Sequence, residues 1–221
     1  MTYDSVKVLV LGDSGVGKSS LVHLICHQKI HSSPSWTIGI SIDVKVHDYK
    51  EGTKDHKPFF IEFHDIGGSC QHATSRSIFY KDFHGVILVH DLSNKKSLNN
   101  LRRWLGELFS KESHCDHFDV DAENMDICRW PILVIGTKLD LVDDICRFKR
   151  TSHFAAECGA EELHLSCTNS RQFAPGTSHA VALSKFFDRS PQIFIVLTQY
   201  NYIITSSFIQ IKELQNAAKS C

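Results

Sequence analysis

The sequence lacks an excess of charge of either sign, because its 221 residues carry 24 Lys and Arg against 25 Asp and Glu. Without a basic surface the chain has no electrostatic footprint for nucleic acid, so we expect no nucleic acid as a partner. The balanced charge and the 42% hydrophobic content also exclude disorder for most of the chain. We therefore expect one domain of ordinary size with a sizeable core, alone or with a short appendage.

Signals for export and membrane attachment are also missing. The first apolar run is short and leads into a glycine-rich loop in place of a cleavage site, so it is no signal peptide. The eight cysteines contain no C-x-x-C pair, which favours reduced thiols in a cytoplasmic protein. The uncharged stretch 193–211 contains polar residues such as Thr198 and Gln199, which argues against a membrane span. Cys221 ends the sequence without a C-a-a-X box, so we expect no lipid anchor; peripheral attachment to membranes through partners stays open.

Apolar runs separated by polar and glycine-rich stretches predict alternating strands and helices. The predicted strands cover residues 6–11, 40–49, 58–64, 85–91, 131–136 and 163–166. The predicted helices cover residues 19–26, 97–109, 151–158 and 178–189. The second and third strands flank a short polar loop and form a hairpin, and the rest alternate with helices. This order indicates an α/β sandwich with a mostly parallel sheet.

The most specific motif is Gly12-Asp13-Ser14-Gly15-Val16-Gly17-Lys18-Ser19, which matches G-x-x-x-x-G-K-[ST] between a strand and a helix. Glycines let backbone N–H groups turn inward around phosphates, and the helix N-terminus adds partial positive charge. Lys18 can reach the β- and γ-phosphates, and the Ser19 hydroxyl can ligate Mg²⁺. The predicted phosphate-binding residues are Gly12, Ser14, Gly15, Val16, Gly17, Lys18, Ser19 and Ser20. Kinases, ATPases and GTPases all use such a loop, so it does not name the base.

A later segment, residues 135–140, resembles the N/T-K-x-D motif by which small GTPases recognise guanine. The resemblance implies that the Asp140 carboxylate accepts two hydrogen bonds from guanine, which adenine cannot supply. It also implies that Lys138 lies across the base, with Thr137 at a position where most members have Asn. Residues 165–169 resemble the second base-binding loop of the same family more weakly. That resemblance implies that the Cys167 N–H donates to guanine O6. The implied base-binding residues are Thr137, Lys138, Leu139, Asp140, Ser166, Cys167 and Thr168.

Two strings between these motifs resemble the switch segments of the same family. Trp36-Thr37-Ile38-Gly39 is similar to switch I, and Asp65-Ile66-Gly67-Gly68 is similar to the D-x-x-G of switch II. The resemblance implies that Ser19 and Thr37 ligate Mg²⁺, that Asp65 holds a Mg²⁺-bound water, and that the Gly68 N–H senses the γ-phosphate.

Order and spacing of the five elements resemble a Rab-like member of the Ras superfamily. The resemblance implies a P-loop domain over residues 1–189, with a six-stranded sheet that contains one antiparallel strand. It also implies that GTP or GDP is bound with Mg²⁺. An acidic loop is expected at about 110–130, and a divergent tail of unknown role at 190–221.

One position departs from the family pattern, because Ser69 stands where most members place the catalytic glutamine. Serine is too short to orient an in-line water, and an extended loop would aim Gln71 elsewhere. We therefore expect a molecular switch with slow GTP hydrolysis, which signals to effector and regulator proteins through its switch segments. The alternative is a nucleotide-stabilised scaffold without relevant hydrolysis. A homodimer stays open, and a small-molecule kinase is disfavoured because Lys138 and Asp140 would have no role.

The fourteen histidines raise the question of a second metal. The densest cluster is His114-Cys115-Asp116-His117, with Cys128 nearby. No pairing within it matches a zinc spacing, so we predict no metal at this cluster.

Overall fold

The computed structural model describes residues 4–72, 76–112, 130–142 and 152–190, and the statements below concern these ranges. The strands are β1 (Asp4–Leu11), β2 (Ile40–Tyr49), β3 (Lys57–Ile66), β4 (Gly85–Asp91), β5 (Ile132–Thr137) and β6 (Glu161–His164). The α-helices are α1 (Lys18–His27), α3 (Lys95–Glu112), α4 (His153–Glu157) and a final helix over residues 178–190. Short 3₁₀ turns lie at Cys70–His72, Ser77–Phe79 and Leu139–Leu141.

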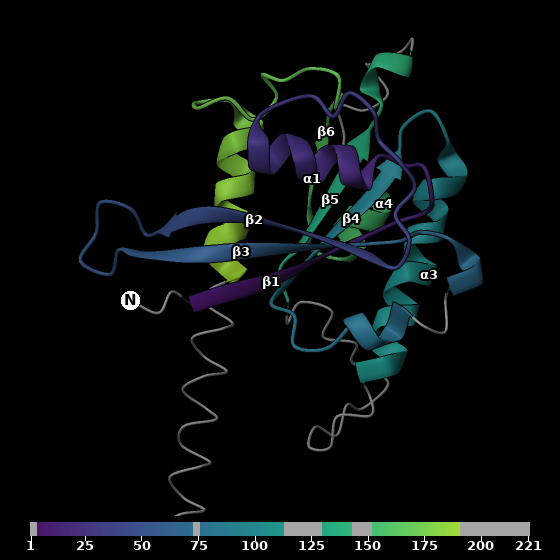
Figure 1. Cartoon of the computed structure of the whole chain (residues 1–221), viewed down its shortest axis with the longest axis horizontal. Helices are drawn as coiled ribbons and strands as arrows, with labels where there is room; N and C mark the ends of the chain where they lie inside the picture. The colour runs from purple at the N-terminus through teal and green to yellow at the C-terminus, as the bar shows by residue number, and fades with distance from the viewer. Residues whose placement is uncertain (1–3, 73–75, 113–129, 143–151, 191–221) are drawn as a thin grey trace, which may run out of the picture.

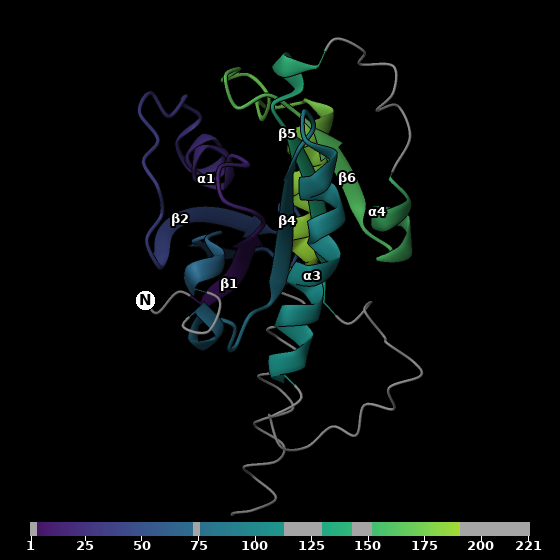
Figure 2. The same ribbon diagram turned by 90° about the vertical axis from the view of Figure 1, so that its right-hand side faces the viewer.

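The six strands form one sheet in the order β2-β3-β1-β4-β5-β6. Only the β2–β3 pair is antiparallel among the described strands, and the other four pairs are parallel. Helix α1 and the final helix cover one face of the sheet, while α3 and α4 cover the other (Figures 1 and 2). The predicted α/β sandwich with one antiparallel strand is confirmed.

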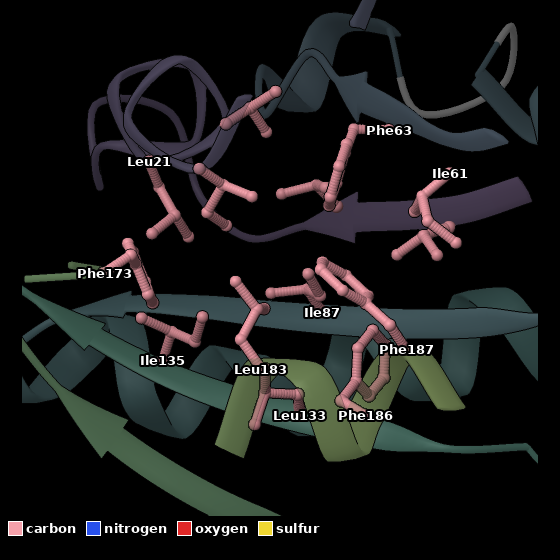
Figure 3. Close-up of a cluster of buried hydrophobic side chains, with 14 of the residues drawn as sticks. Leu21, Ile61, Phe63, Ile87, Leu133, Ile135, Phe173, Leu183, Phe186 and Phe187 are labelled. Atoms are coloured by element: carbon pink, nitrogen blue, oxygen red, sulfur yellow. The ribbon is translucent and has the colours of Figure 1, made fainter. Parts of the chain in front are cut away.

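Successive residues of the central strands supply two separate cores, because side chains alternate between the faces of a strand. In β1, Val8 and Val10 face the α1 side, whereas Leu9 and Leu11 face the α3 side, and all four are fully buried. The α1 side is filled by aromatic rings from the sheet and the final helix, as Figure 3 shows for Phe63, Phe186 and Phe187. Burial on both faces explains why these strands are nearly continuous apolar runs in the sequence.

The edge strand β2 differs from the central strands, because it exposes apolar side chains on one face and turns polar side chains toward the helices on the other. Its outward residues Ile42, Val44 and Val46 are each more than half exposed. Its other face turns polar groups toward the helices, where Asp43 lies 3.3 Å from His27 Nε2 and His47 Nε2 lies 2.8 Å from Asp188 Oδ1. Polar contacts therefore attach β2 to the helix layer, and its apolar side chains face outward.

Several predictions fall partly or wholly outside the described residues. Helix α3 continues to Glu112, and most of the predicted acidic loop lies beyond it. The tail after Ser190 and the cluster of His114–His117 with Cys128 also lie outside the described ranges. Within the described residues, no helix combines the length and apolarity that crossing a membrane requires.

Candidate functional site

The phosphate loop connects β1 to α1 and encloses the Lys18 side chain. Lys18 is buried, and its Nζ donates to the carbonyl oxygens of Gly12 and Asp13, both at 2.8 Å. Burial lowers the pKa of Lys18 from 10.5 to about 8, although the negative charges of Asp65 and Asp13 act to raise it. Within the described chain its ammonium group bonds only to backbone carbonyls, so its charge is available to an anion placed at the loop.

Two glycines let other backbone segments approach this loop closely. A Cβ on Gly12 would lie 2.1 Å from the carbonyl oxygen of Val89, in β4. A Cβ on Gly68 would lie 2.4 Å from the backbone nitrogen of Ser14 and 2.7 Å from the oxygen of Gly12. Both contacts are shorter than any side chain permits. The last residue of the string that resembles switch II therefore lies directly against the phosphate loop.

Three oxygen-bearing side chains from distant segments converge beside the loop. Ser19 Oγ donates to Asp65 Oδ2 at 2.5 Å and lies 2.8 Å from Thr37 Oγ1. Thr37 Oγ1 donates to the same Asp65 oxygen at 3.2 Å. Asp65 Oδ1 is buried and has no hydrogen-bond partner among the described residues, and burial raises the pKa of this carboxyl. Two hydroxyl oxygens on one carboxylate oxygen, with the other carboxylate oxygen lacking a partner, are hard ligands that fit Mg²⁺, so the residues present suit the predicted ion.

The two predicted base loops lie side by side at the ends of β5 and β6. The Leu139 N–H donates to the Leu165 carbonyl at 3.2 Å, and Ser166 Oγ donates to Asp140 Oδ1. Lys138 has a left-handed backbone with φ 58° and donates from Nζ to Asp91 Oδ2 at 2.7 Å. The Ser166 hydroxyl orients the Asp140 carboxylate. Because Asp140 is exposed, this carboxylate is open to a ligand.

The neighbouring residues of these loops are more enclosed. Thr137 is fully buried, and its Oγ1 donates to the carbonyl oxygens of Val16 at 2.5 Å and His90 at 3.0 Å. Its side chain thus connects the base loop to the phosphate loop inside the protein. Burial raises the pKa of the partly buried Cys167 thiol to about 12.

The sequence predicts the last strand over residues 163–166, but β6 covers Glu161–His164 and begins two residues earlier. Strand β6 ends at His164, because the Ser166 hydroxyl bonds Asp140 and accepts the Thr168 N–H at 3.2 Å in place of strand pairing.

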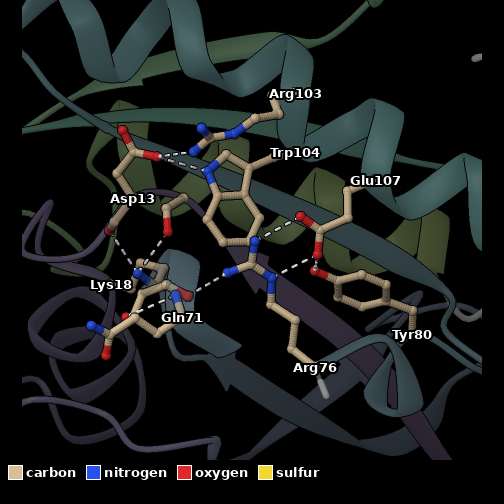
Figure 4. A network of polar contacts seen from close by, with 10 residues as sticks. Asp13, Lys18, Gln71, Arg76, Tyr80, Arg103, Trp104 and Glu107 are labelled. Carbon is tan, nitrogen blue, oxygen red and sulfur yellow. Dashed lines mark hydrogen bonds and ion pairs between the residues drawn. The ribbon is translucent and has the colours of Figure 1, made fainter. Parts of the chain in front are cut away.

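Sequence reasoning missed the attachment of the phosphate loop to α3. Asp13 Oδ1 accepts the Trp104 indole N–H at 3.0 Å (Figure 4). Asp13 Oδ2 accepts the Asn100 amide at 2.6 Å. Arg103 lies 3.4 Å from the same carboxylate. These partners stand nearly ninety residues away in the sequence, so no local pattern indicates the contact.

Sequence reasoning also missed an enclosed ion pair between the switch II region and α3. The Arg76 guanidinium forms two hydrogen bonds with Glu107, both at 2.6 Å, and stacks 4.1 Å from the centre of the Trp104 ring (Figure 4). Arg76 also donates to the Ser69 carbonyl at 3.0 Å, and the Tyr80 hydroxyl donates to Glu107 at 2.9 Å. The backbone of Ser69 is therefore held by α3 through Arg76. Gln71 is exposed, and its N–H reaches Ser69 Oγ at 3.4 Å.

We expect Glu107→Gln to destabilise the protein by about 3 kcal/mol, because the buried Arg76 charge loses its partner. Burial alone would raise the pKa of Glu107, but the bonds from Arg76 and Tyr80 lower it below its ordinary 4.5. The stabilisation by this pair is therefore complete above pH 4.5 and is lost as the pH falls through the folded-state pKa. Urea unfolding of both proteins at several pH values measures the difference.

The matched control is Glu157→Gln, which breaks the exposed contacts of Glu157 with Arg102 and His153. We expect it to cost about 0–1 kcal/mol. Equal losses in the two variants would show that enclosure of the Arg76 pair contributes nothing.

Comparisons with known proteins agree with this arrangement, and the predicted place in the Ras superfamily is confirmed. The Ras family profile matches residues 7–176. Rab-like protein 3 of Mus musculus is 50% identical over 198 residues, which cover 84% of this chain and 84% of that protein. Rab-like protein 3 of Danio rerio is also 50% identical, with coverage of 84% and 85%. Small GTPase-like protein LIP2 of Arabidopsis thaliana is 42% identical over 146 residues, which cover 62% of this chain and 43% of that protein. Because the family match spans the phosphate loop, both switch strings and both base loops, the chain belongs to the Ras family as a Rab-like small GTPase.

Proposed function

We propose that the protein binds GTP and GDP together with Mg²⁺ and acts as a molecular switch whose intrinsic hydrolysis is slow. The observation that carries the proposal is the convergence of Ser19, Thr37 and Asp65 beside the buried Lys18. These residues come from the phosphate loop and from both switch strings. Their meeting supports a site that is complete only when both switch segments lie against the nucleotide.

Each residue of this cluster has a specific role in the proposal. The Lys18 ammonium group and the backbone N–H groups of residues 14–20 hold the phosphates. Ser19 and Thr37 would hold the metal directly, and Asp65 would hold it through water. When bound, Mg²⁺ neutralises charge on the β- and γ-phosphates. Gly68 lies against the phosphate loop, and in the proposal its N–H senses the γ-phosphate, so loss of that phosphate releases switch II.

Recognition of guanine is assigned to the two base loops. The exposed Asp140 carboxylate, oriented by Ser166, accepts from the guanine ring N–H and amine. Lys138 lies against the base, and the Cys167 N–H donates to guanine O6. Thr137, Leu139 and Thr168 complete the loops, with Thr137 acting through its bonds inside the protein.

The slow hydrolysis follows from Ser69. Its side chain is short and lies within 3.4 Å of the Gln71 backbone, and its carbonyl is held by Arg76. The serine side chain does not extend far enough from this backbone position to orient a water molecule. The same observation favours a second candidate, a scaffold that GTP stabilises and that does not depend on hydrolysis.

The partners and the place of action are also part of the proposal. Trp36 and Ile38 flank Thr37 and are 89% and 84% exposed, so switch I offers an apolar surface to effector and regulator proteins. The described cysteines, Cys26, Cys70, Cys158 and Cys167, are free thiols, which suits the reducing cytoplasm. The domain that carries these functions extends over residues 1–189.

Ser19→Asn tests the proposed metal site. We expect the variant to lose affinity for GTP more than for GDP, because the γ-phosphate depends on the metal held by Ser19. Titration with fluorescent nucleotides in excess Mg²⁺ measures the dissociation constants for GTP and GDP. The control is Ser184→Asn, on the exposed face of the final helix. Unchanged binding of both nucleotides by Ser19→Asn would exclude Ser19 from the site.

Asp140→Asn tests the choice of base. We expect guanine nucleotides to bind weaker by about 1.5–3 kcal/mol, because a charged acceptor is lost. Xanthine nucleotides should gain relative affinity, since their C2 carbonyl accepts from the new amide. Competition between the two bases measures this preference, with Asp55→Asn in the β2–β3 turn as control. An unchanged preference would remove Asp140 from base recognition.

Ser69→Gln separates the switch from the scaffold. We expect single-turnover hydrolysis to be slow in the parent and about tenfold faster in the variant, which corresponds to roughly 1.4 kcal/mol of barrier. Affinity for GTP should hardly change, because the residue acts on the water and not on the phosphates. The nucleotide content of the purified protein is measured alongside. Turnover that is absent from both proteins, with GTP bound, would favour the scaffold; a fast parent would show that another group orients the water.

A further inference from the structure

A second cluster of metal-ligating side chains lies on the α3 and α4 side of the sheet. Within the described part of the chain, His90, Glu162 and His164 bring one ligand atom each to within 4.8 Å of one another. His90 belongs to β4, and the other two belong to β6. Glu162 and His164 are two residues apart in a strand, so their side chains share a face. The proposed function uses none of these three side chains.

His90 and His164 lie on strands that are separated by β5. At the position between them β5 has a glycine, which carries no side chain. Strand β5 lies between β4 and β6, and the register aligns His90 with Gly136 and Gly136 with His164. A Cβ on Gly136 would meet the Leu92 side chain at 2.6 Å and the His164 ring at 2.9 Å. The glycine therefore leaves space over β5 for the His164 ring, beside Leu92.

We propose that His90, Glu162 and His164 form a binding site for one transition-metal ion, with Zn²⁺ as the expected occupant. Zn²⁺ binds His nitrogen and carboxylate oxygen at about 2.0–2.2 Å, so ligand atoms of a tetrahedral site lie about 3.3–3.5 Å apart. Glu162 Oε1 lies 3.4 Å from His90 Nε2 and 3.2 Å from His164 Nε2. Two edges of a tetrahedron are therefore already formed, and two imidazoles with one carboxylate are a donor set that Zn²⁺ uses.

The burial and bonding of the donors favour an ion over a simple hydrogen-bonded group. His90 is 3% exposed, and its Nε2 makes no hydrogen bond of ordinary geometry among the described residues. The two carboxylate oxygens of Glu162 have different partners. Oε2 accepts the Ser152 N–H at 2.5 Å, and Oε1 faces both histidines. A ligating carboxylate is commonly oriented by such an outer bond.

The position of Glu162 also suits a cation. Its side chain is 2% exposed and its Oε1 lies between the two imidazole Nε2 atoms. The His164 side chain is 14% exposed, which gives an ion access from the solvent. The site would connect β6 to β4 beside the base loops and act structurally.

The test uses the full chain with Mg²⁺ in excess, so that the oxygen cluster beside the phosphate loop does not take up Zn²⁺. We expect ZnCl₂ at about 100 times its Kd to raise the Tm by about 5–10 °C. Titration with CoCl₂ should give the visible absorption of tetrahedral Co²⁺, saturating at a single equivalent and displaced by Zn²⁺. His164→Asn and Glu162→Gln should each weaken Zn²⁺ binding at least about tenfold and abolish the rise in Tm.

The matched control is His153→Asn, since His153 lies on neighbouring α4 and its side chain is 87% exposed. This variant should respond to Zn²⁺ as the parent does. Far-UV circular dichroism without metal checks that each variant is folded, and the Co²⁺ titration of the parent does not depend on any variant. The proposal fails if the parent gives no tetrahedral Co²⁺ spectrum. It fails equally if folded His164→Asn binds Zn²⁺ like the parent.

Discussion

The candidate site depends on the close approach of three backbone segments around the phosphate loop. Gly12 brings the loop against the Val89 carbonyl of β4, and Gly68 brings switch II against the backbone of Ser14. Larger residues at either position would separate these segments. Since Asp65 lies three residues before Gly68, the second contact also sets the distance from Asp65 to Ser19. The oxygen cluster proposed for Mg²⁺ therefore rests on packing of backbone against backbone.

Helix α3 stabilises the same arrangement from the outer side. Its Trp104 ring binds Asp13 through the indole N–H and carries the Arg76 guanidinium on its face. Arg76 in turn holds the carbonyl of Ser69. One aromatic side chain thus contacts both the phosphate loop and the residue that anchors switch II. These contacts place α3 directly against both segments of the proposed switch.

The sequence predicted what is local and missed what is assembled in space. Strands buried on both faces, such as β4, appear as uninterrupted apolar runs, and the phosphate loop is a contiguous motif. The short strand β6 was misplaced because its residues are only half buried and Ser166 bonds a neighbouring loop instead. The contacts of Arg76 join segments without any fixed spacing. The His90 cluster depends on register across a glycine in β5, which no single segment of the sequence reveals.

The exposed apolar face of the edge strand β2 affects how the protein behaves in concentrated solution. The strand lies at the edge of the described sheet, so one row of its N–H and C=O groups has no strand partner there. Together with the exposed Ile42, Val44 and Val46, this row is a template for adding a foreign strand. Aggregation in concentrated samples should therefore begin at β2. A lysine in place of Val44 would protect this edge without entering either core.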